Sequence, residues 1–154
     1  MSTHDEHMGR AENNESLLNS LQSSRNEPTF PDWYITISFY TAGHYLEAML
    51  AVVKPVVSYM GHNVQIEHST DVNKVGGNMY GAMPTVHRVR FRLMMKNKIF
   101  EGMRQPYTLL YNVNQPQKYN NYMPNKIHWA LVKRGLLSVN DHCKALKFDT
   151  GWRP

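Results

Sequence analysis

The sequence has very little cysteine, and its apolar stretches are short. A single thiol, Cys143, has no partner for an internal disulfide and excludes a zinc site built mainly from cysteines. No apolar run reaches the roughly 18 residues that a membrane-spanning helix needs, because Lys54 and Pro55 interrupt the longest one. The polar first residues lack the apolar segment of a signal peptide. We therefore expect a cytoplasmic protein with no membrane contact.

Charged residues are also few, at 19%, whereas the hydrophobic content of 42% is typical of a folded protein. A length of 154 residues fits one domain with its own core. Lys and Arg number 17 against 12 Asp and Glu, which gives a formal net charge of +5. A basic protein favours an acidic partner, nucleic acid above all.

Proline, glycine and polar residues divide the chain into helical segments. The pattern predicts a disordered polar lead over residues 1–14, one helical domain over 15–148 and a loose tail over 149–154. The segment 32–53 is apolar nearly all round, which is typical of a central helix. Pro55 ends or kinks it, and "VVSYMG" predicts one more helical turn.

The rest of the domain adds a long connection and further helices. Gly, Asn and Asp residues over about 61–83 predict a long crossover loop. A basic amphipathic helix is expected over about 84–103, and a short one around Leu109 and Leu110. The last helix begins near Pro124 and breaks at Gly135 or Ser138. The fold predicted is an all-α bundle of four to five helices.

Several motifs resemble those of small HEPN-domain proteins, which are prokaryotic helical bundles. The first long helix carries an aspartate–tryptophan pair and then an aromatic–histidine–alanine pattern, here Asp32, Trp33, Phe39, Tyr40, Ala42, His44, Tyr45 and Ala48. A histidine, two residues and an arginine open the next helix, matched by His87 and Arg90. A tyrosine-rich stretch follows over 107–121, with Lys118 where arginine is usual. The similarity covers roughly residues 31–121.

The resemblance implies an HEPN-like bundle that acts on RNA, by binding or by metal-independent cleavage. Such proteins are commonly homodimers of toxin–antitoxin or antiviral defence systems, so a cognate antitoxin or defence protein is an expected partner. Their catalytic hallmark is an arginine and a later histidine with four to six residues between them. This chain lacks it: Arg134 and His142 come nearest, one residue too far apart. Activity as an endoribonuclease is therefore left open.

His44, His87 and Arg90 are the candidate catalytic residues. If the two helices pack antiparallel, the three side chains can converge between them. A histidine can then take the proton of a ribose 2′-OH, and an arginine can stabilise the charge on the phosphorus centre. A phosphate-binding pocket would need the same residues. The structural alternatives are a core His44 bonded to a carbonyl or tyrosine hydroxyl, a capping His87, and an Arg90 paired with Glu47 or Asp32.

Candidate nucleic-acid-binding residues lie on the basic helix and in the tyrosine-rich stretch: Arg88, Arg92, Lys96, Lys118 and Tyr119. Cations bind phosphates and aromatic rings stack on unpaired bases. A solvated helix face, with Tyr107, Tyr111 and Tyr119 in packing roles, is the alternative.

We expect no metal and no cofactor. His62, His68, Asp71 and His87 are residue types that zinc accepts, but they show no tight spacing. His4 and His7 fall in the predicted lead and are interpreted as incidental. Two function classes remain: an RNA-acting HEPN-like component, and a non-catalytic helical protein-interaction module with structural core histidines.

Overall fold

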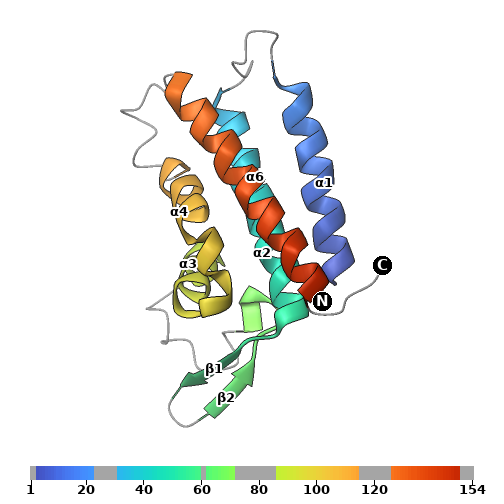
Figure 1. The fold of residues 1–154 in the computed structure, drawn as a ribbon, viewed down its shortest axis with the longest axis vertical. Helices are drawn as coiled ribbons and strands as arrows, with labels where there is room; N and C mark the ends of the chain where they lie inside the picture. Colours follow the sequence, from blue (N-terminus) through green and yellow to red (C-terminus); the bar gives the residue numbers. More distant parts are fainter. Residues whose placement is uncertain (1–2, 23–30, 60–61, 72–85, 115–125, 150–154) are drawn as a thin grey trace.

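The computed structural model describes residues 3–22, 31–59, 62–71, 86–114 and 126–149. Five α-helices pack as a bundle, and a two-stranded hairpin projects from one end (Figure 1). The elements are α1 His4–Ser20, α2 Pro31–Val53, β1 Val56–Tyr59, β2 His62–Gln65, α3 Val86–Lys96, the 3-10 helix η2 Lys98–Met103, α4 Arg104–Val113 and α6 Lys126–Asp149. The prediction of a helical bundle is confirmed, with the hairpin as an addition.

Helix α1 corrects the prediction of a disordered lead, because the chain is helical from His4 onward. Thr3 caps it: its hydroxyl accepts the N–H of Glu6, and the Glu6 carboxylate accepts the N–H of Thr3 at 3.0 Å. This reciprocal pair satisfies two backbone donors at the helix start. His7 and the apolar side chains of Met8, Ala11 and Leu18 are buried, so α1 joins the bundle and packs along α2.

Helix α2 forms the centre of the bundle, as its all-round apolar pattern predicts. Its buried side chains contact α1, α3, α4 and α6, and the largest of them are Tyr34, Phe39, Tyr45, Leu46 and Leu50. The helix ends at Val53. Lys54 then takes a left-handed φ of 48° while its N–H still donates to the Leu50 carbonyl at 2.9 Å, and Pro55 prevents further helix.

A hairpin stands where one more helical turn is predicted. β1 and β2 pair antiparallel, with Val57 opposite Val64. Ile66 returns to the bundle, where it is fully buried and donates its N–H to the Pro55 carbonyl at 2.9 Å. β-Branched valines after a proline favour strand over helix, which explains the difference. Of the predicted crossover loop, residues 62–71 form this strand and a turn, and residues 72–83 lie outside the described residues.

Helix α6 runs from Lys126 to Asp149 without the predicted break. Gly135 is buried against α4: a Cβ there would lie 3.4 Å from the Pro106 carbonyl oxygen. Close helix packing therefore outweighs the poor helix propensity of glycine. The start agrees with the prediction near Pro124, and the tail beyond 149 lies outside the described residues.

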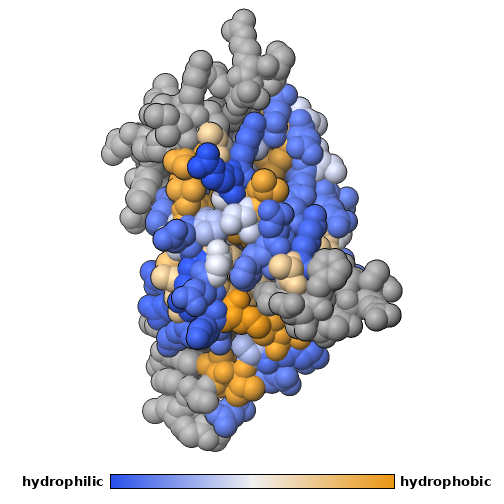
Figure 2. All heavy atoms as spheres, in the orientation of Figure 1, coloured by the Kyte–Doolittle hydropathy of each residue, from blue (hydrophilic) through white to orange (hydrophobic). Residues whose placement is uncertain are grey.

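Hydrophilic side chains dominate the face seen in Figure 2, with apolar side chains in scattered patches between them. Within the described ranges, none of the helices combines the length and the apolar character needed to cross a membrane.

Candidate functional site

A buried ion pair between α2 and α3 is the centre of the most polar region in the core. The Glu47 side chain is completely buried, and its Oε1 accepts from Nε of Arg90 at 2.5 Å. A charge withdrawn from water needs such a partner to be tolerated. The predicted structural alternative for Arg90, pairing with Glu47, is confirmed.

Ser69 supplies the remaining donors to this carboxylate. Its backbone N–H donates to Glu47 Oε2 at 2.9 Å, and its hydroxyl donates to Oε1. Burial opposes ionisation of Glu47, but the Arg90 charge and the hydrogen bonds from Ser69 outweigh it, so the pKa of Glu47 lies below its usual value. The carboxylate is therefore ionised at neutral pH.

The turn after β2 is built to present Ser69 and its neighbour His68 to α2. Asp71 holds it closed, since Oδ2 accepts the N–H groups of Glu67 and His68 at 3.0 and 2.9 Å. His68 thereby places its Nε2 3.5 Å from Glu47 Oε2, and its Nδ1 lies 2.8 Å from Thr70 Oγ1.

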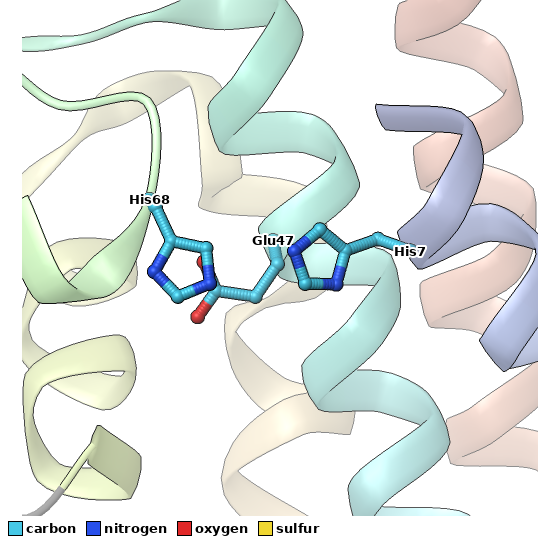
Figure 3. A group of neighbouring side chains, drawn as sticks. All are labelled: His7, Glu47 and His68. Atoms are coloured by element: carbon cyan, nitrogen blue, oxygen red, sulfur yellow. The ribbon is translucent and has the colours of Figure 1, made fainter. Parts of the chain in front are cut away.

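His7 of α1 completes the group from the opposite side (Figure 3). Its ring stacks on His68 with centroids 5.3 Å apart, and its Nδ1 lies 3.2 Å from Nδ1 of His44. Its Nε2 is buried and has no hydrogen-bond partner among the described residues. Burial lowers the pKa of His7 to about 4, helped by the neighbouring His68, His44 and Arg10 and opposed by Glu47. His7 is therefore neutral near pH 7.

Among the three predicted catalytic residues, the charge of Arg90 acts on the pKa values of His44 and His87. Burial lowers the pKa of His44 and of His87, and Arg90 lowers each further. Their contacts differ, however. Within the described ranges, His44 pairs with His7 and not with the carbonyl or tyrosine hydroxyl of the structural alternative. His87 packs against the rings of Phe39 and Tyr40, with centroids 5.0 and 5.3 Å away.

The arginine itself is held in place on two sides. Its Nε is bound by Glu47, and Nη1 lies against α2, 3.0 Å from where a Cβ on Gly43 would stand. Arg90 as a whole is 8% exposed. A catalytic role of His44, His87 and Arg90 stays a prediction. In this conformation the Arg90 guanidinium is paired with the Glu47 carboxylate.

The predicted nucleic-acid-binding residues divide in two. Arg88 and Lys96 are exposed on α3 and Arg92 is half-buried, whereas Lys118 and Tyr119 lie outside the described residues. Tyr107 is fully buried and its ring lies 5.9 Å from that of Phe39, and the Tyr111 ring stacks on Phe91 at 4.8 Å. The packing alternative for these two tyrosines is confirmed.

Arg134 and His142 lie on the one continuous helix α6, eight residues and therefore roughly 12 Å apart along its axis. Arg134 is exposed, and His142 Nε2 lies 3.1 Å from the Ile99 carbonyl oxygen. The two groups do not form a compact pair.

The sequence analysis missed His7 and Ser69 as members of the polar region, and it named Glu47 only as a structural partner of Arg90. The Thr3–Glu6 spacing is a capping-box signal that places His7 on a helix. Glu47 is the one ionisable carboxylate of an apolar helix interior, three residues after His44 and hence on the same side. Nothing local in the sequence singles out Ser69.

His7, Glu47 and His68 also bring their ligand atoms within 4.8 Å of one another, the one such group found in the described part of the chain. Of the zinc-accepting residues considered from the sequence, His68 belongs to it and Asp71 shapes its turn. His87 does not belong to the group, because its ring packs against those of Phe39 and Tyr40.

Comparisons with protein-family models, with curated proteins and with solved structures found no match for this chain. The HEPN resemblance therefore stays a prediction, as do the homodimer and the antitoxin or defence partner that it implies.

Proposed function

We propose that this chain binds RNA through the basic surface of α3 and η2, formed by Arg88, Arg92, Lys96 and Lys98. The observation that carries the proposal is the segregation of charge along the chain. Residues 1–71 hold nine acidic and three basic side chains, and residues 72–154 hold three acidic and fourteen basic ones. The densest part is 86–104, with six basic residues and one acidic residue.

Local structure keeps this charge at the surface. Arg88, Lys96 and Lys98 are exposed and Arg92 is half-buried. Arg90 and Arg104 make contacts within the fold. Arg90 pairs with Glu47, and Arg104 donates to the carbonyls of Met94 and Asn97 at 3.3 and 3.2 Å. A cationic helix face of this kind binds phosphates independently of sequence.

Binding without cleavage fits the polar core better than catalysis by His44, His87 and Arg90. The arginine that would stabilise a phosphorus transition state is buried and already neutralised by Glu47. RNA in place of DNA is taken from the HEPN resemblance, with a defence or toxin–antitoxin setting as the corresponding context.

Fluorescence anisotropy with a labelled single-stranded RNA in EDTA tests the proposal. Up to four phosphate contacts give a slope of log K against log salt of about −2 to −3 for a single strand. Reversing two charges, in Arg88→Glu/Lys96→Glu, should weaken binding by about tenfold or more and flatten that slope. Arg134→Glu, an exposed arginine on α6, is the matched control and should bind nearly normally.

Equal losses in the α3 variant and the control would contradict the assignment of the surface. Absence of any RNA or DNA binding would favour the protein-interaction module instead. Intact RNA after incubation supports binding only, and metal-independent cleavage that is lost in His44→Ala would restore the catalytic interpretation.

A further inference from the structure

We propose that His7, Glu47 and His68 form a binding site for one divalent transition-metal ion of the zinc type. The three come from α1, from the middle of α2 and from the turn after β2 (Figure 3). Two imidazoles and one carboxylate are a ligand set that zinc accepts, with a fourth position left for water or another ligand. The site is independent of the RNA-binding surface proposed above.

His7 carries a buried nitrogen that a metal ion could bind. The residue is 2% exposed, and in the part of the chain that the structure describes its buried Nε2 makes no hydrogen bond. Buried polar groups normally have partners, because leaving one unsatisfied costs about 1–3 kcal/mol. In Figure 3 the outer edge of the His7 ring faces Glu47 and His68. A metal ion there gives this nitrogen a bond.

The contact with His44 is compatible with the tautomer of His7 that a metal ion requires. His7 Nδ1 and His44 Nδ1 lie 3.2 Å apart, so one of them donates and the other accepts. When His7 donates, its Nε2 carries the lone pair that a metal needs. Metal-ligating histidines commonly hold their second nitrogen in this way, which sets the ring orientation.

The Glu47 carboxylate can still accept one more bond at Oε2. Glu47 Oε1 already accepts from Arg90 and Ser69, whereas Oε2 accepts a single hydrogen bond from the described residues, that of the Ser69 N–H. An ionised carboxylate oxygen has two lone-pair sites, so Oε2 has one left. It faces His68 Nε2 at 3.5 Å, close to the roughly 3.4 Å that separates two ligand atoms on a tetrahedral zinc ion.

His68 has its own supporting contact. Two groups of Thr70 contact its Nδ1: the backbone N–H donates to it at 3.2 Å, and Oγ1 lies 2.8 Å away. Ligation through Nε2 requires the proton on Nδ1, and Thr70 Oγ1 is then its acceptor in place of the bond from the Thr70 N–H. The ligand atoms span at most 4.8 Å, so a shift of about 1 Å brings all three within bonding distance of one ion. The positive charge of Arg90 beside Glu47 favours an anionic fourth ligand such as hydroxide.

Zinc titration of the full chain against a chromogenic chelator, together with the visible spectrum of a cobalt complex, tests the site. One ion per chain is expected, with the intense absorption of four-coordinate cobalt. His68→Ala should weaken zinc binding by about a hundredfold, and Thr70→Val by about tenfold. His4→Gln is the control, since His4 lies beside Asp5 on the same helix and outside the group.

Because His68 lies on a turn and its side chain is 18% exposed, its replacement should leave the metal-free fold intact, as checked by circular dichroism. The proposal is overturned if the unaltered chain binds no zinc or cobalt, or if His68→Ala binds as tightly as the unaltered chain. It is equally overturned if His4→Gln loses as much affinity as His68→Ala, because the ion then sits at the start of α1.

Discussion

Removing the cation of the buried ion pair should destabilise the fold strongly. Arg90→Met keeps most of the side-chain length but removes the positive charge beside the fully buried Glu47 carboxylate. The carboxylate then keeps its hydrogen bonds from Ser69 and has a His68 nitrogen 3.5 Å away. An uncompensated buried charge costs about 3–5 kcal/mol of the free energy of unfolding. For a domain of this size the loss corresponds to a fall in Tm of roughly 6–20 °C.

The pH dependence of this penalty has a definite sign. In the unaltered chain the pKa of Glu47 is below its usual 4.5, so its contribution to stability is complete above that pH and is lost as pH falls through the lower native value. Without Arg90, burial dominates and raises the pKa. The carboxyl of the variant then takes up a proton on mild acidification, and the penalty shrinks.

Urea unfolding followed by circular dichroism, with a chelator present, at about pH 7 and about pH 5, measures both effects. The exposed Arg134→Met is the control and should change the free energy of unfolding by no more than about 0.5 kcal/mol. A loss below about 1 kcal/mol in Arg90→Met at neutral pH would refute the reasoning, because the pair would then be screened like a surface one. So would a penalty that grows on acidification.

Three further predictions concern single positions. Gly43→Ala should lower the free energy of unfolding by about 1–3 kcal/mol in urea titrations, since its Cβ would stand 3.0 Å from Arg90 Nη1. Gly9→Ala, with open space around its Cβ, should instead gain up to about 1 kcal/mol in the same assay. Burial and Arg90 hold the pKa of His87 below 6.5, so its contribution to stability is complete above pH 6.5 and is lost as pH falls below it. His87→Phe should therefore lose less stability than the unaltered chain between about pH 6.5 and pH 5. Thermal melts in which Tm falls equally in both proteins over this pH range would contradict this.

The sequence predicted the bundle because its strongest signal, the all-round apolar segment of α2, depends on burial alone. It also offered the Arg90–Glu47 pair, since a buried charge on each of two adjacent helices must be compensated. Where tertiary contacts decide the outcome, local patterns misled: Gly135 continues α6 because α4 packs against it.

The sequence predicted only part of the polar region, again because long-range contacts assemble it. His44 and Arg90 stand out within helical patterns. By contrast, His7, which pairs with His44, and Ser69, which donates to Glu47, come from segments whose patterns predict a polar lead and a loop. The hairpin that carries His68 and Ser69 back to α2 depends on Ile66 reaching the core, a long-range contact that periodicity does not report. The metal-ligand group is assembled from three such segments and has no short motif.

Amide chemical shifts of isotope-labelled protein, followed by NMR during addition of single-stranded RNA, test the central claim most directly. The account predicts shifts concentrated in residues 86–104, weakening as salt is raised, with α1 little affected. Shifts concentrated on α1 or on the first half of α6, or a spectrum unchanged by saturating RNA at low salt, would contradict it.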